Sequence, residues 1–392
     1  MNKKNIFVFL IIFFAFLIIP GCWNRSEIEK KAIVAGMGID REKDNDKVDL
    51  TLQVVVPRKV KSTGEGEKAV WIVSSTGSSV FEAGRNFGLQ SGRKALWSHA
   101  QVLVIGEEAA KKGINEFIDY FERDHEVRRR ICIMVAKGDA KDIMNANVEI
   151  EKIPAFSIRD LGQAGEVTSK ISPVCLQEFI GMISSKTSCA YTPGIEVFEE
   201  EDEKENKEKK DKRLRLTDTA VFKEYKLRGW FDQYETRGML WIIGKVQSGI
   251  IEVECLKGGK TPTSLEILRT KSKIIPEIKN GKITITVEVS ELGNVGATPI
   301  PCADLSDPQN IKELERRENE VIKKEIKQTI KKAKEFNTDV FGFGEAVYRK
   351  YPKEWEELED KWDEIFPNLE IIVKVDAKIR RTGLLSEAVK SE

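Results

Sequence analysis

The sequence is poor in the residues from which catalytic and metal sites are most often built. Its 392 residues include only two histidines, His99 and His125. No C-x-x-C spacing occurs among the six cysteines, which excludes zinc-ribbon and thioredoxin-type sites. The phosphate-binding pattern G-x-x-x-x-G-K-[ST] is absent, and the glycine pairs at 36–38 and 342–344 lack the third glycine of a dinucleotide-binding loop. We therefore predict a protein that is not an enzyme and that holds no metal or organic cofactor.

The sequence also lacks an excess of charge of either sign. Its 64 lysines and arginines balance 64 aspartates and glutamates, which gives a formal net charge of zero. A nucleic-acid-binding protein needs a basic excess to offset phosphate charge, so we exclude that class. Hydrophobic residues make up 41% and charged residues 33% of the chain. These proportions are typical of a globular protein rather than of a disordered chain, and the length predicts two or three domains.

No apolar run is long enough to cross a bilayer comfortably. The longest has 14 residues, at 6–19, whereas a transmembrane helix needs about 20. Lysines precede this run and Cys22 follows it closely, so residues 1–21 fit a secretory signal peptide. The tetrapeptide Ile-Pro-Gly-Cys at 19–22 resembles a lipobox, in which a diacylglyceryl lipid joins the cysteine thiol and cleavage exposes that cysteine. Two alternatives stay open: an ordinary signal peptide with a chance cysteine, and a signal anchor that is not cleaved.

We predict that Cys22 is the lipid attachment site and ties the protein to a membrane. Two acyl chains hold a protein on a bilayer far more firmly than one. Trp23 follows directly, and tryptophan favours the headgroup layer. Nine residues, 23–31, separate the lipid from the first predicted strand, and an extended segment of that length reaches only about 30 Å. The folded part is therefore expected to lie close to the bilayer.

The other cysteines do not form an obvious disulfide framework. Once Cys22 is lipidated, five remain, an odd number that cannot all pair within the chain. Cys132 lies in the apolar run 131–135 and is expected to be a small buried side chain. Cys175 and Cys189 are near enough in sequence for a bridge to be considered. We predict that disulfides are not what organises this fold.

The chain divides at a highly charged segment. Residues 22–198 alternate between strand-like and amphipathic helical patterns, which predicts an N-terminal α/β region of one or two subdomains. Every residue in 199–213 is charged except Asn206, and such a run is normally a solvated linker or insertion; a partner-binding tail is the alternative. We place a domain boundary there.

Residues 214–392 predict a C-terminal α+β domain. Alternating or apolar runs favour strands at 214–223, 237–243, 246–254, 264–274, 282–290 and 369–380. A long amphipathic helix is expected at about 307–336, with Asp307 as its cap and Pro308 in its first turn. Trp355 and Trp362 belong to an apolar stripe that is expected to be core. The predicted fold class is α+β, with several domains and mixed β-sheets flanked by helices.

Several longer segments, taken in order, resemble one family. They are GCWNRSEIEKKAIVAGMGID at 21–40, SHAQVLVIGEEAAKKGINEFIDYFERDHEVRRRICIMVAKGDAKDIM at 98–144, DTAVFKEYKLRGWF at 218–231, ETRGMLWIIGK at 235–245 and FGFGEAVYRKYPKEWEELEDKWDEIFPNLEIIVKVDAKIRRTG at 341–383. Together they resemble the Ger(x)C family, the lipoprotein C subunits of bacterial spore germinant receptors. The sequence departs from the family pattern in its charged run at 199–213 and in Asn24, where an acidic residue is common.

The resemblance implies a subunit without catalytic activity on the outer leaflet of the spore's inner membrane. It would assemble with two polytopic partners, a channel-like A subunit and a transporter-like B subunit that senses nutrients. Only Cys22 carries over with a chemical role. Five further residues carry over as landmarks that determine the fold: Trp23, Gly342, Gly344, Trp355 and Trp362. A solute-binding lipoprotein that captures the germinant itself, with a pocket between domains, remains the alternative, and a cell-wall enzyme is a third class.

Overall fold

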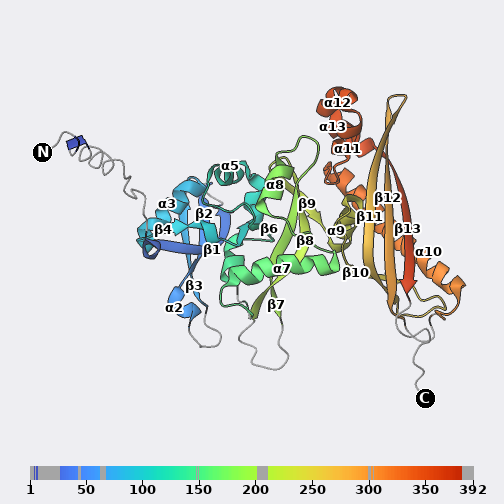
Figure 1. Ribbon diagram of the computed structural model, residues 1–392, viewed down its shortest axis with the longest axis horizontal. Helices are drawn as coiled ribbons and strands as arrows, with labels where there is room; N and C mark the ends of the chain where they lie inside the picture. Colours follow the sequence, from blue (N-terminus) through green and yellow to red (C-terminus); the bar gives the residue numbers. More distant parts are fainter. Residues whose placement is uncertain are drawn as a thin grey trace, which may run out of the picture.

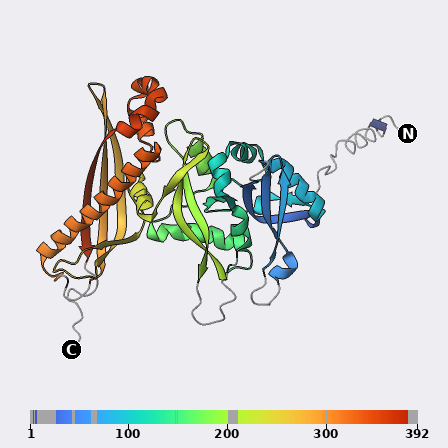
Figure 2. The same cartoon turned by 180° about the vertical axis from the view of Figure 1, so that it is seen from behind.

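The computed structural model describes residues 4, 6–7, 27–42, 46–61, 68–146, 148, 150–200, 211–298, 302 and 304–381. Figures 1 and 2 show an elongated molecule with two β-sheets placed one after the other along its long axis. The first sheet is built from the N-terminal and middle parts of the chain, and the second from the C-terminal part. Both sheets are mixed and carry helices, which confirms the predicted α+β class.

The larger sheet has nine strands in the order β3-β2-β1-β5-β6-β7-β8-β9, and β4 pairs with the start of β1. The central strand β1 is buried along nearly all its length because helices cover both of its faces. The strands are β1 Lys31–Arg41, β2 Val48–Val55, β3 Val70–Gly77, β4 Lys94–Leu96, β5 Val102–Ile105, β6 Cys132–Ala136, β7 Tyr191–Glu200, β8 Asp211–Lys223 and β9 Lys226–Phe231.

Helices connect the parallel strands of this sheet, as βαβ crossovers require. The pairs β1·β5, β5·β6 and β6·β7 are parallel. The helices of this part are α2 Pro57–Val60, α3 Val80–Ser91, α4 Glu107–Lys112, α5 Asn115–Arg123, α6 Ala140–Asn145, α7 Pro154–Thr168, α8 Leu176–Ile183 and α9 Gln233–Ile243.

The charged run begins and ends in two paired strands of the first sheet. Its described residues lie in β7 and β8, which pair antiparallel from Tyr191 opposite Val221 to Glu200 opposite Asp211. The sheet therefore continues across the predicted boundary, because alternating apolar residues before and after the charged run supply two strands of one hairpin. Residues 201–210 lie outside the described residues.

The second sheet has the order β10-β11-β12-β13, with β12 and β13 parallel. Helix α10 (Pro308–Phe336) crosses it and buries its apolar stripe, including Leu314 and Ile322. The Asp307 side chain accepts a hydrogen bond from Gln309 N (2.8 Å), so this helix begins where its cap was expected. The other elements here are β10 Gly249–Val253, β11 Thr263–Lys279, β12 Lys282–Ala297, α11 Phe343–Lys350, α12 Pro352–Leu358, α13 Trp362–Ile365 and β13 Glu370–Arg381.

Helix α9 lies where a strand was predicted, at 237–243. Asp232 and Glu235 form a capping box at its start, since each side chain accepts a hydrogen bond from the other residue's backbone N–H. The helix is buried almost all round, and a helix of that kind shows no alternation to distinguish it from a buried strand. One apolar core runs continuously from the first sheet past α9 to the second.

A disulfide forms that the sequence did not indicate, and Cys132, which was expected to be buried, is partly exposed. Cys255 and Cys302 form a disulfide with a Cα–Cα distance of 5.1 Å, while Cys175 and Cys189 are free thiols. Cys175 instead lies opposite Cys132. Within the described residues, no helix is both long and apolar enough to span a bilayer.

Candidate functional site

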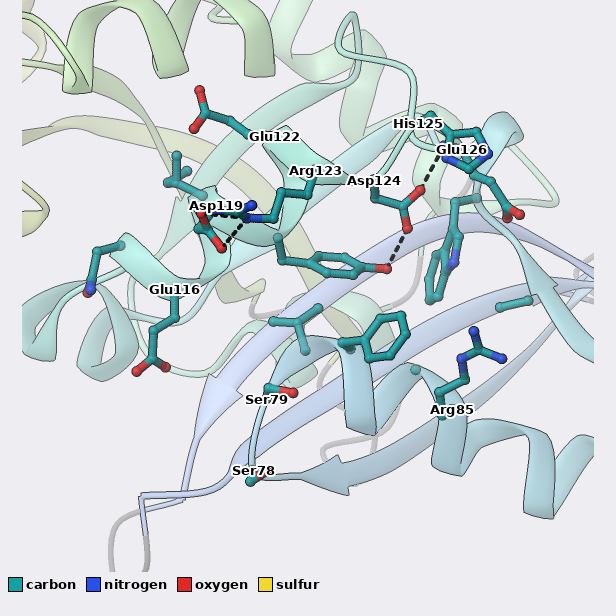
Figure 3. Close-up of a pocket in the computed structure, with 18 of the residues that line it drawn as sticks. Ser78, Ser79, Arg85, Glu116, Asp119, Glu122, Arg123, Asp124, His125 and Glu126 are labelled. Atoms are coloured by element: carbon teal, nitrogen blue, oxygen red, sulfur yellow. Dashed lines mark hydrogen bonds and ion pairs between the residues drawn. The ribbon is translucent and has the colours of Figure 1, made fainter.

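A groove with a volume of about 1030 Å³ lies in the part of the molecule built on the first sheet. One wall is the start of α3, with Ser78, Ser79 and Arg85, and the other is formed by α5 and the segment that follows it, from Glu116 to Glu126 (Figure 3). Between the walls the lining is apolar, with Trp97, Ile118 and Tyr120, and Phe81 adds an apolar side chain to the α3 wall. Mixed apolar and polar lining of this kind is typical of binding sites.

The first wall depends on how α3 begins. Ser79 caps the helix by accepting a hydrogen bond from Glu82 N (3.2 Å). The Glu82 carboxylate in turn accepts bonds from Ser78 N (2.7 Å) and Ser78 Oγ (2.5 Å), and these bonds lower its pKa. One turn later Gly84 allows close packing, because a Cβ there would lie 3.2 Å from the Trp97 ring. The wall is therefore held by short local contacts that fix Phe81 over the groove.

The second wall follows from the amphipathic pattern of α5. Phe117, Ile118 and Phe121 face the core at helical spacing. The opposite face turns Glu116, Asp119 and other polar residues toward the groove, as Figure 3 shows.

The charged groups of the groove are largely paired with one another. Asp119 and Arg123 are 2.9 Å apart, Lys94 and Glu126 are 2.6 Å apart, and the Arg85 guanidinium lies 5.0 Å from the centre of the Phe81 ring. These are surface pairs, which contribute little to stability but fix where charge is presented.

A tyrosine at the groove floor is held in its neutral form. Tyr120 Oη donates a hydrogen bond to Asp124 Oδ2 (2.9 Å). Burial, followed by the negative charge of Asp124, raises the pKa of Tyr120. The phenol is thus a fixed hydrogen-bond donor at neutral pH rather than a base. Such a floor suits the binding of a ligand or a partner segment.

The chain enters its fold beside this groove. Lys31, the first residue of β1, pairs with Lys94 of β4, and Lys94 lines the groove.

Of the sequence-predicted site residues, Cys22 and Trp23 lie outside the described residues. Only one of the two histidines lines the groove, namely His125. His99 instead ends the short 3-10 helix Trp97–His99. Among the described residues, no three or more His, Cys, Asp or Glu side chains gather as metal ligands would.

The other predicted landmark residues surround Asp339, which lies far along the chain from the residues of the groove. Its buried carboxylate accepts hydrogen bonds from Phe343 N (3.1 Å), Gly344 N (2.8 Å) and Trp362 Nε1 (3.2 Å). Burial raises the pKa of Asp339 to about 6, and these hydrogen bonds oppose the rise. Trp355 packs against Trp362 with ring centroids 5.1 Å apart and ring planes tilted by 58°.

Steric constraints explain why glycine occupies both positions, 342 and 344. Gly342 adopts φ of 74° at the N-cap of α11, a left-handed conformation that glycine reaches without strain. A Cβ on Gly344 would lie 2.7 Å from Thr187 O and 2.9 Å from the Trp355 ring. The cluster also binds the segment ahead of β7, since Cys189 N donates to Asp339 O (2.8 Å). These residues join the middle of the chain to its C-terminal helices.

A second set of buried contacts, which the sequence did not reveal, connects α9 to α10. Arg237 and Glu325 form a buried ion pair, and Trp241 Nε1 donates to Glu325 Oε2 (3.1 Å). A Cβ on Gly238 would lie 2.5 Å from Glu325 O, so only glycine permits this helix approach. The available signal was Glu325 itself, a carboxylate inside the apolar stripe of a predicted amphipathic helix.

Comparison with known proteins agrees over nearly the whole chain. Residues 24–197 match the family model described as spore germination protein N-terminal domain, and residues 217–383 match the one described as spore germination B3/GerAC like, C-terminal. Spore germination protein KC of Bacillus subtilis (strain 168) is 31% identical over 98% of this chain and 97% of its own. Spore germination protein B3 of the same organism is 26% identical over 97% and 98%.

A solved structure shows the same fold. The crystal structure of the GerBC protein superposes with a TM-score of 0.54 over 88% of this chain and 96% of its own, at 19% identity.

Proposed function

The chain belongs to the Ger(x)C family of spore germination proteins, and from that membership we propose that it is the lipid-anchored C subunit of a nutrient germinant receptor. A role in spore germination and a spore-associated location follow from the family. The proposal adds attachment through Cys22 to the outer leaflet of the inner membrane, and assembly with polytopic A and B subunits. It also holds that the subunit acts by contact, without catalysis, cofactor or nucleic acid.

The place where the chain enters its fold carries this proposal. Residues 23–31 reach at most about 30 Å from a lipid on Cys22. Lys31 at their end pairs with Lys94 in the wall of the groove. A lipid anchor would therefore hold the groove near the bilayer surface, within reach of the external loops of membrane-embedded partners. We assign the groove to such a contact.

The anchor is tested with Cys22→Ala, using Cys132→Ser as a control that leaves Cys22 in place. We expect Cys22→Ala to abolish lipid incorporation and release the protein from spore membranes, while the control stays bound. Membrane retention of Cys22→Ala equal to that of the parent would contradict the anchoring.

Assembly is tested by purifying the full chain from spore membranes in mild detergent. We expect two polytopic proteins to accompany the parent chain in fixed proportion. Recovery of the chain alone, from membranes that contain both candidate partners, would contradict assembly.

Direct capture of a germinant is the second candidate, and the volume and polar rim of the groove favour it. The predicted pocket for this function lay between domains, whereas the groove is lined by residues between Ser78 and Glu126 together with Tyr225. Calorimetric titration of the full chain with amino acids and sugars decides between the two. Saturable binding that is lost on mutation of groove residues would favour capture, and no heat of binding would favour the assembly role.

A further inference from the structure

Cys132 and Cys175 lie directly opposite each other, although many residues separate them in sequence. Cys132 begins β6, and Cys175 is the residue immediately before α8. The two form an antiparallel bridge outside the named strands. On either side of it, Ile133 N donates to Val174 O (3.1 Å) and Leu176 N donates to Ile131 O (2.9 Å).

This hydrogen-bond pattern determines the geometry of the cysteine pair. Because the bonds flank the two cysteines, the pair is of the non-hydrogen-bonded type, in which opposite Cα atoms are about 4.5 Å apart and side chains are closest. Directly opposite residues also project to the same side of the ladder. Disulfides join Cα atoms about 4.4–6.8 Å apart. The backbone thus already holds the two residues at bonding distance.

We propose that Cys132 and Cys175 are a redox site that forms a reversible disulfide. Both are free and partly exposed in the structure, so an oxidant can reach them. Cys189, the remaining free cysteine of the described residues, lies in a different place, where its backbone bonds to Asp339. The Cys255–Cys302 disulfide shows that the same fold accommodates an oxidised pair elsewhere.

The disulfide would lie next to β6 and β7, whose pairing is the shortest in the large sheet. The junction of β6 and β7 has two residue pairs, Val135 with Gly194 and Ala136 with Ile195. Residues 174–176 lie beside the start of β6, and α8 then leads the chain into β7. A covalent link from β6 to the start of α8 would therefore reinforce the connection between the N-terminal strands and the β7–β9 strands.

The chemistry requires a disulfide oxidant, of the kind that thiol–disulfide oxidoreductases or oxidised glutathione provide. One cysteine thiolate attacks a sulfur of that oxidant, which forms a mixed disulfide and releases one thiol. The second thiolate then attacks the mixed disulfide, so the Cys132–Cys175 bond forms and a second thiol leaves. Two electrons and the two cysteine protons thus pass to the oxidant, which leaves as two thiols. Burial raises the pKa of Cys132, which lowers the thiolate fraction of that sulfur and slows its exchange with the oxidant.

The test uses the full lipidated chain in detergent, equilibrated with oxidised and reduced glutathione and then alkylated. We expect mass spectrometry without reduction to find one cross-linked peptide pair containing Cys132 and Cys175. We also expect the unfolding midpoint to rise by about 5 °C on oxidation. Cys132→Ser and Cys175→Ser should each abolish the cross-link and the rise, and Cys189→Ser should keep both.

Hydrogen exchange tests whether the disulfide stabilises the sheet, as a question separate from whether the disulfide forms. Oxidation should slow amide exchange several-fold in residues 131–136 and 191–195 of the parent and of Cys189→Ser. Alkylation of both cysteines after full oxidation of the glutathione pool, or a cross-link to Cys189, would overturn the proposed site. A Cys132–Cys175 bond that leaves exchange at both segments unchanged would overturn its role at the β6–β7 junction.

Discussion

The charge of Glu318 on α10 acts on Glu291 of β12 inside the C-terminal core, and none of their four carboxyl oxygens has a hydrogen-bond partner among the described residues. Their exposed fractions are 3% and 0%. Burial, with a contribution from Glu318, raises the pKa of Glu291 to about 9. Burial, with a contribution from Glu315, raises the pKa of Glu318 to about 7.

We expect this pair to make stability fall as the pH rises. The native state binds these protons more tightly than the unfolded chain, whose carboxyls have a pKa of 4.5. The stabilisation is complete below that value and is lost as the pH rises through the folded values near 7 and 9. Between about pH 5 and about pH 8.5 the two carboxyls together should lower the unfolding free energy by roughly 7 kcal/mol. Urea unfolding at both values measures it.

The variants Glu291→Gln and Glu318→Gln isolate that effect from other titrating groups. Each lacks one ionisable carboxyl, so the difference in unfolding free energy between the two pH values should shrink. Glu313→Gln, which removes an exposed carboxylate of the same helix, is the matched control. An unchanged pH dependence in both core variants would show that the pair does not titrate in this range.

Breaking the ion pair between α9 and α10 should strongly destabilise the protein. Arg237→Met leaves Glu325 buried without its cation, at a cost of about 3–5 kcal/mol. Arg237→Met combined with Glu325→Met should cost less than either single change, because no unpaired charge remains. Denaturant unfolding measures all three. A double variant less stable than both single variants would contradict this account, and Arg316→Met, on the exposed face of α10, should be close to neutral.

Two glycines on helices should respond to alanine in opposite directions. Gly344→Ala places a Cβ within 3 Å of Thr187 O and the Trp355 ring, and such overpacking costs about 1–3 kcal/mol. Gly181→Ala on α8 meets no atom within 4 Å and should stabilise the helix by about 0.5–1 kcal/mol. Thermal unfolding of both variants measures the contrast. Equal shifts in the two would argue against close packing at Gly344.

The role of the groove is tested on two exposed side chains of the same helix. Phe81 faces the groove and is 55% exposed, whereas Leu89, at the other end of α3, is 87% exposed and does not line it. We expect Phe81→Ala to weaken co-purification of the membrane partners at least several-fold, with little change in unfolding temperature. Leu89→Ala should leave both unchanged. Equal co-purification of the two variants would place the contact elsewhere on the molecule.

Local signals in the sequence were enough to predict the long helix α10 but not the neighbouring helix α9. Asp307, Pro308 and the apolar stripe that follows define α10 almost to the residue. Residues 239–243 form an unbroken apolar run, which suits a buried strand or a buried helix equally. The capping box of Asp232 and Glu235 distinguishes the two, and it lies outside the run itself.

Features that depend on distant pairing could not be predicted in this way. The sequence places Cys175 nearer to Cys189 than to Cys132, but strand pairing brings the distant cysteine opposite. The amphipathic pattern of α5 was visible, whereas the opposing wall at Ser78 and Phe81 depends on how α3 packs in three dimensions. The landmark glycine at 344 was singled out, but its neighbour Thr187 belongs to another part of the chain.

The parallel pairing of β12 with β13 also bears on biosynthesis. A ribosome releases β12 well before β13, because α10 and the helices after it are made in between. Until β13 emerges, one edge of β12 has no neighbouring strand within its own sheet, and chaperones and proteases can bind it. We therefore expect the C-terminal part to be the last to acquire protease resistance during maturation. A nonsense codon shortly before residue 370 should yield a product that is degraded rather than a shortened, functional protein.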